Sequence, residues 1–78
     1  MFFTGEMKER DPNRLFGIYT RITTVHYEQV PDMRVLQFMM NFMLWVQETY
    51  SRDPFFVEDD ELDKFINEYS LHLSKTTL

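Results

Sequence analysis

The stretch "VLQFMMNFMLWV", residues 35–46, decides the fold of this 78-residue chain. As a helix of about 3.6 residues per turn, it carries apolar side chains around most of its circumference. The remaining polar stripe is formed by Arg34, Gln37, Asn41 and Glu48. A helix that is apolar nearly all round is buried on several sides. We therefore expect a helix over residues 33–50 that is central in the domain, or else also packs against another molecule.

Two further segments have helical periodicity, one on each side of this stretch. The first follows Asp11 and Pro12, a typical helix start, and predicts a helix over residues 12–27. The other predicts a helix over residues 59–74. The expected fold is all-α, a compact three-helix domain with a central Met- and aromatic-rich second helix. It spans residues 11–74, between an extended or irregular N-terminal arm over residues 1–10 and a tail over residues 75–78.

The same periodicity predicts which side chains are buried. On the first helix these are Leu15, Ile18, Tyr19, Ile22, Val25 and His26, and on the third they are Leu62, Phe65, Ile66, Tyr69 and Leu73. Gly17 suggests a close approach of another backbone, and Asp32 is the expected cap of the second helix. The connection "RDPFF", residues 52–56, is expected to turn its two aromatic rings into the core.

Composition narrows the class of function. The chain has no cysteine, so a disulfide framework is excluded and an intracellular protein is the better expectation. No apolar run reaches the roughly 20 residues of a membrane span, and no signal peptide is evident. The net charge of −5 argues against direct nucleic-acid binding and favours a partner protein with a basic surface.

An acidic run, "EDDELD", follows the Phe-Phe step at residues 58–63. Its acids suit the first turn of a helix, where the helix dipole favours negative charge, and Glu58 as cap would place Val57 and Leu62 as a hydrophobic staple. The same acids are candidates for binding a basic partner. These candidate residues are Glu58, Asp59, Asp60, Glu61 and Asp63.

No pattern in the sequence indicates catalysis. There is no cysteine, no glycine-flanked serine and no Gly-rich phosphate loop, so we expect a protein that is not an enzyme and has no catalytic residue and no cofactor. The two histidines, His26 and His72, lack a second ligand at metal-binding spacing, and the acids lack the pattern of a calcium loop. No metal site is therefore expected.

The second helix offers a different kind of site. Methionine-rich surfaces adapt to several partners, although such a stripe in a small chain is more often core. Surplus apolar surface on this helix would serve self-association or a partner. Arg34, Gln37 and Asn41 would line its polar edge.

Three stretches carry a resemblance: "DPNRLFGIYTRI", "VPDMRVLQFMMNF" and "DPFFVEDDELDKFINEY". Together they resemble a group of small, largely uncharacterised proteins of Firmicutes and their phages, and "PDMRVLQFM" is loosely similar to YihD-like bacterial proteins. The resemblance covers about residues 9 to 70. It implies a fold family and a phage or mobile-element setting, and it supplies no catalytic residue.

The leading functional expectation is a phage interaction protein that binds and inhibits a host protein, such as a CRISPR nuclease of the defence system. The acids would then meet a groove that normally holds nucleic-acid backbone. Two alternatives stay open. One is a small homodimeric structural or regulatory protein, and the other is a sponge for a signalling nucleotide whose phosphates contact Arg14, Arg21 and Arg34.

Overall fold

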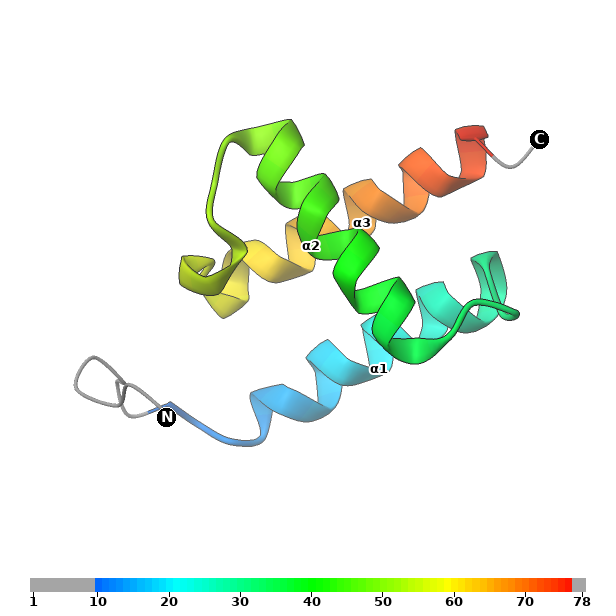
Figure 1. Cartoon of the computed structure of the whole chain (residues 1–78). Coiled ribbons are helices and arrows are strands. Elements are labelled where there is room, and N and C mark those ends of the chain that lie inside the picture. The colour runs from blue at the N-terminus through cyan, green and yellow to red at the C-terminus, as the bar shows by residue number, and fades with distance from the viewer. Residues whose placement is uncertain (1–9, 77–78) are drawn as a thin grey trace.

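A computed structural model describes residues 10–76 of the chain, with the side chain of residue 76 left out. Within this range the chain forms three α-helices and one short 3₁₀ helix, and no strand (Figure 1). These elements are α1 (Arg14–Gln29), α2 (Val35–Tyr50), η1 (Pro54–Phe56) and α3 (Asp59–Thr76). The predicted all-α, three-helix fold is confirmed. Most of the predicted N-terminal arm and half of the predicted tail lie outside the described residues.

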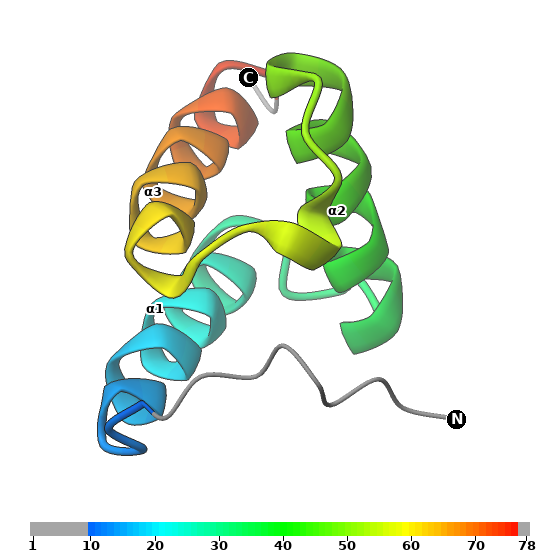
Figure 2. The same cartoon turned by 90° about the vertical axis from the view of Figure 1, so that its left-hand side faces the viewer.

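The helices form two layers. α1 and α3 lie side by side and run in the same direction, and α2 crosses them on one face (Figures 1 and 2). The parallel direction follows from connectivity, because α2 carries the chain back between them. η1 lies against α2, in the connection that leads to α3 (Figure 2).

The core lies between α2 and the layer made by α1 and α3. Each helix gives it one stripe of side chains, and on α2 that stripe is Phe38, Phe42 and Val46, which recur every fourth residue. Phe38 is only 1% exposed, and its ring stacks on the His26 ring of α1 at a centroid distance of 4.6 Å. The other buried residues are Ile18, Ile22, Val25, Phe65, Ile66, Tyr69 and Leu73.

The caps predicted for α1 and α2 do not lie at the capping positions of these helices. The Asp11 carboxylate accepts a hydrogen bond from the backbone amide of Asn13 at 3.0 Å, but α1 begins at Arg14 and its capping position is Asn13, so Asp11 acts in the turn before α1. Asp32 does not cap α2. The capping position is Arg34, which has extended backbone and no side-chain cap, because residues 31–33 form a turn in which the Met33 amide bonds to the Val30 carbonyl.

α3 matches its prediction closely. Its first residue is Asp59, and the Glu58 carbonyl accepts a hydrogen bond from the Leu62 amide, which places Glu58 at the capping position. Val57 and Leu62 are both partly buried against the core, as a hydrophobic staple requires. Leu62 and its four partners on the predicted stripe face the core, and Leu71 points away from it.

Three expectations about packing are wrong. Tyr19 is exposed and Leu15 marginally so, because the core face of α1 is narrower than its apolar pattern. Phe55 and Phe56 are 73% and 63% exposed, since η1 turns their rings outward rather than into the core. A Cβ on Gly17 would meet nothing within 4 Å, so no backbone of the described residues approaches it.

α2 is buried along one stripe, and the expectation that it is the central helix is confirmed. It is central in the sense that it faces both other helices. Its far side is not covered by any described residue, because three helices in two layers provide no element to cover it (Figure 2).

Candidate functional site

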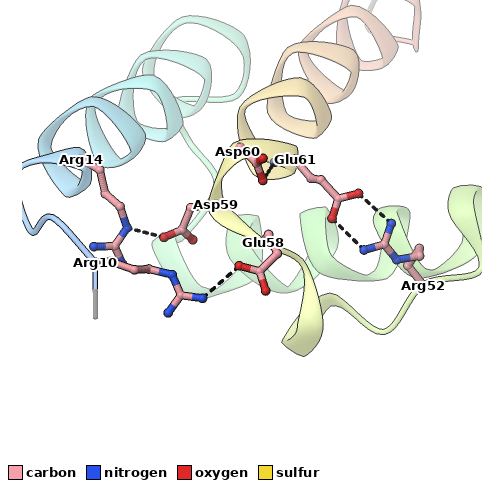
Figure 3. Close-up of polar contacts among 7 residues, drawn as sticks. All are labelled: Arg10, Arg14, Arg52, Glu58, Asp59, Asp60 and Glu61. Carbon is pink, nitrogen blue, oxygen red and sulfur yellow. Dashed lines mark hydrogen bonds and ion pairs between the residues drawn. The ribbon is translucent and has the colours of Figure 1, made fainter. Parts of the chain in front are cut away.

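The acidic run is paired with arginines of the same chain (Figure 3). Glu58 accepts a hydrogen bond from Arg10 at 2.9 Å, and Asp59 accepts one from the Nε of Arg14. Both carboxylates thereby tie the start of α3 to the start of α1 and the residues before it. This pairing uses side chains that the sequence presented as free to bind a partner.

Glu61 makes the most regular of these pairs. Both of its carboxylate oxygens accept hydrogen bonds from Arg52, at 2.8 and 3.0 Å, in the two-pronged geometry for which the guanidinium group is suited. The hydrogen bonds and charge of Arg52 hold the pKa of Glu61 below its ordinary value, and Glu61 in turn raises the pKa of Arg52. This pair fastens the connection after α2 to the first turn of α3.

Asp63 extends the pairing along α1. It accepts a hydrogen bond from Arg21 at 3.0 Å, and further along the helices Gln29 bonds to the hydroxyl groups of Ser70 and Ser74 at 3.2 and 3.3 Å. Residues later in α1 pair with residues later in α3, as expected for two parallel helices. We call this line of contacts the polar seam; its members are Arg14, Arg21 and Gln29 on α1 and Asp59, Asp63, Ser70 and Ser74 on α3.

Asp60 is the one acid of the run without an arginine partner among residues 10–76. Its carboxylate accepts only the backbone amide of Glu61, at 2.9 Å, and the residue is exposed. A basic partner that approached the other four acids would compete with the four arginines already bound there. Asp60 is therefore the acid most available to another molecule.

The other predicted site residues lie elsewhere. Arg34, Gln37 and Asn41 are exposed near the start of α2, where the Asn41 amide contacts the Met33 sulfur at 3.6 Å. They do not join the acids, which contact α1 and Arg52. The arginines proposed for a nucleotide are also divided, because Arg14 and Arg21 are in the polar seam and Arg34 is on α2.

Two apolar faces are left uncovered by the described residues. The first, which we call the aromatic face, lies on α1 and consists of Phe16, Tyr19 and Tyr27, with Thr20 and Thr23 between them. Phe16 and Tyr27 are each 75% exposed. A shallow hollow of about 660 Å³ borders Phe16 and Tyr19, and none of its lining residues within the range 10–76 is charged.

The second face, which we call the outer stripe, lies on the far side of α2 from the core. Its members recur at three- and four-residue intervals and are Leu36, Met40, Met43 and Leu44. Leu36 is the most exposed of them, at 80%. Phe55 and Phe56, on η1, add two exposed rings that contact each other edge to face, with centroids 4.9 Å apart.

Sequence reasoning did not identify Arg10 and Arg52 or the aromatic face. A signal for the seam was present, since Arg14 and Arg21 are seven residues apart and Asp59 and Asp63 are four apart, so each pair lies on one side of its helix. The exposure of Phe16 also had a signal, because Phe16 lies off the predicted apolar stripe of its helix, whereas Tyr19 was expected to be buried.

No constellation typical of chemistry emerges in residues 10–76. This part of the chain has no group of three or more potential metal ligands and no helix long and apolar enough to cross a membrane. His26 is partly buried between α1 and α2, with its Nε2 atom 2.7 Å from the Met33 carbonyl, and burial raises the pKa of Tyr69. Tyr69 belongs to the core, and His26 packs against the core residue Phe38.

Comparison with known proteins yields no match to this chain among protein-family models, curated proteins or solved structures. The resemblance to small phage proteins therefore stays a prediction.

Proposed function

We propose that this chain is a non-enzymatic binding protein that attaches to another protein through the aromatic face of α1. The single observation that carries this proposal is the exposure of Phe16, Tyr19 and Tyr27 on one side of a helix. Exposed apolar patches of this kind commonly mark protein interaction sites.

The residue types favour a protein as the partner. Phenylalanine and tyrosine are enriched in protein interfaces, and tyrosine is prominent among the residues that contribute most of the binding energy. Tyrosine combines a large apolar ring with a hydroxyl group, so it suits a surface that is wet when free and dry when bound. Thr20 and Thr23 add hydrogen-bonding groups between the rings without adding charge.

In its specific form the proposal is that of a phage or mobile-element protein that acts in the host cytoplasm and inhibits a host defence protein, such as a CRISPR nuclease. This form depends on the resemblance and on the net charge of −5, which suits a partner with basic surfaces. The acidic run remains a candidate second contact, with Asp60 as its most available member. A nucleotide sponge has less geometric support, because Arg14 and Arg21 already bind carboxylates.

The test uses a panel of purified CRISPR nucleases from Firmicutes, each mixed with excess chain and assayed for DNA binding and cleavage. We expect one nuclease to lose activity. The double variant F16A/Y27A should lose inhibition at least about tenfold, and the double variant F55A/F56A, which removes two exposed rings elsewhere, should keep it. A D60K variant measures the separate contribution of the acid.

Two outcomes would count against the proposal at different levels. If every nuclease stays active at any ratio of chain to enzyme, the specific inhibitor is excluded. Affinity capture from a host lysate with wild type and F16A/Y27A in parallel then tests the general form, which fails if both baits retain the same proteins.

A further inference from the structure

We infer that the outer stripe of α2 is an interface with a second copy of this chain, in which the two α2 helices pack antiparallel. This interface is separate from the aromatic face of α1. It would make the protein a two-fold symmetric dimer.

The chemistry of the outer stripe favours a helix as the partner. Leu36, Met40 and Leu44 recur every fourth residue, so they form one continuous ridge on the helix. Met43 widens this ridge, and every member is partly or largely exposed. Interfaces between identical subunits are more apolar than those between transient partners, and a Leu/Met ridge without an aromatic ring contrasts with the aromatic face of α1.

Charge favours a second copy over an unrelated partner. The α2 sequence from Val35 to Gln47 contains no charged residue, although the whole chain carries a net charge of −5. Two copies that meet along this surface therefore keep their like charges away from the contact. A strongly basic partner would find no acid on the stripe to recognise.

The charges at the two ends of the stripe specify the direction. Arg34 precedes it in sequence and Glu48 follows it, close to four whole turns apart, and both lie on the polar stripe that borders it, with Gln37 and Asn41. Neither forms an ion pair with any residue in the range 10–76 that the structure describes. In an antiparallel pair the Arg34 end of each copy lies beside the Glu48 end of the other, whereas a parallel pair would bring like charges together.

The apolar ridge and the pair of flanking charges have nearly the same midpoint along α2, as a two-fold axis requires. The midpoint between Leu36 and Leu44 is residue 40, and the midpoint between Arg34 and Glu48 is residue 41. A single two-fold axis near these residues matches the apolar ridge with itself and also satisfies both charge pairs. Isologous dimers use the same patch on both subunits in this way.

The test is sedimentation equilibrium of the full chain over a wide concentration range, up to about millimolar. We expect a monomer–dimer equilibrium for wild type. M40E, which places a charge in the centre of the stripe, should weaken dimerisation at least about tenfold. L71E, which adds the same charge at an exposed leucine on α3, should leave it unchanged. Circular dichroism checks that both variants fold.

A charge exchange tests the direction. R34E alone should weaken the dimer several-fold, because it replaces two attractive pairs with two repulsive ones, and the double variant R34E/E48R should restore it. A wild type that stays monomeric, or a dimer that M40E leaves intact, would overturn the interface. A dimer that R34E leaves unaffected would overturn the antiparallel arrangement. Binding to a host protein is tested separately, with the F16A/Y27A variant of the aromatic face.

Discussion

α3 is attached to its two neighbours by different chemistry. Toward α2 its Tyr69 ring meets the rings of Phe42 and Trp45 at centroid distances of 5.2 and 5.1 Å, and Phe38 lies 6.0 Å away. Toward α1 it adds the polar seam, whose charged side chains remain about a third to a half exposed. One side is dry and aromatic, and the other combines apolar contact with wet ion pairs.

The two sides of α3 therefore have different roles: the aromatic side stabilises the fold, and the polar seam sets how α1 and α3 are aligned. Burial of apolar surface contributes roughly 25 cal/mol per Å², so the rings between α2 and α3 supply much of the free energy of folding. Exposed ion pairs contribute about 0–1 kcal/mol each, because water and salt screen them. The seam therefore adds little stability, but its ordered partners match only in one parallel register of α1 and α3.

The largest expected effect comes from breaking the dry side. Phe42→Ala, which removes the buried ring of α2 that meets Tyr69 of α3, should lower the free energy of unfolding by about 3–5 kcal/mol, through lost burial and the cavity left behind. Met40→Ala on the same helix removes an exposed side chain and should change it by less than about 0.5 kcal/mol in the monomer. Urea denaturation at low protein concentration measures both, and equal effects would contradict the placement of the core.

A smaller effect is expected beside the seam, where Gly17 faces open space. Gly17→Ala should stabilise the protein by about 0.5–1 kcal/mol, because alanine has the higher helix propensity and its methyl group meets no neighbour. Thermal unfolding should show a higher midpoint. A lower midpoint would mean that something does occupy this space, as the sequence had suggested.

Removing an ion pair of the polar seam should change the free energy of unfolding by a smaller amount still. A double-mutant cycle with Arg14→Gln and Asp59→Asn should give a coupling free energy of about 0.2–1 kcal/mol, which shrinks as salt is added. A coupling that is large and insensitive to salt would show that this pair is dehydrated. The division between a dry side and a wet side would then fail.

The last prediction concerns how the stability of the fold depends on pH. The pKa of Glu61 is lower in the folded chain than its ordinary value, chiefly because of the hydrogen bonds from Arg52. A carboxylate of this kind stabilises the fold above its unfolded pKa, and this contribution is lost as the pH falls through the folded pKa. Below about pH 4.3, the unfolded value for glutamate, we expect stability to fall less steeply in Glu61→Gln and in Arg52→Gln than in wild type. Denaturation at several pH values measures these slopes.

The sequence predicted the parts of the fold that depend on one helix at a time. The stripe on α3 is confirmed because its residues Leu62 to Leu73 form one clear apolar face, and Glu58 lies at the predicted capping position, which is a local feature. Which side chains of α2 are buried was harder to predict, because apolar residues lie on most sides of this helix. Only the number of neighbouring helices decides which of them are covered. Phe55 and Phe56 were expected in the core, but the short helix η1 turns their rings outward.

The candidate site was predictable only in part. That acids would gather at the start of α3 followed from the sequence, but their partners did not, because Arg10 and Arg14 come close to Glu58 and Asp59 only in the folded chain. Helix order and direction are tertiary properties. A pattern read along one helix cannot contain them, although the spacing of Arg14 and Arg21 was a usable hint.

The polar seam also has a consequence for the order of folding. Its contacts join residues 41 to 45 positions apart in the chain, so they form only after a long loop has closed. Local helical turns and the shorter link between α2 and α3 can form first. The seam then belongs to the last step of folding, and weakening it should mainly speed unfolding while the rate of folding changes little.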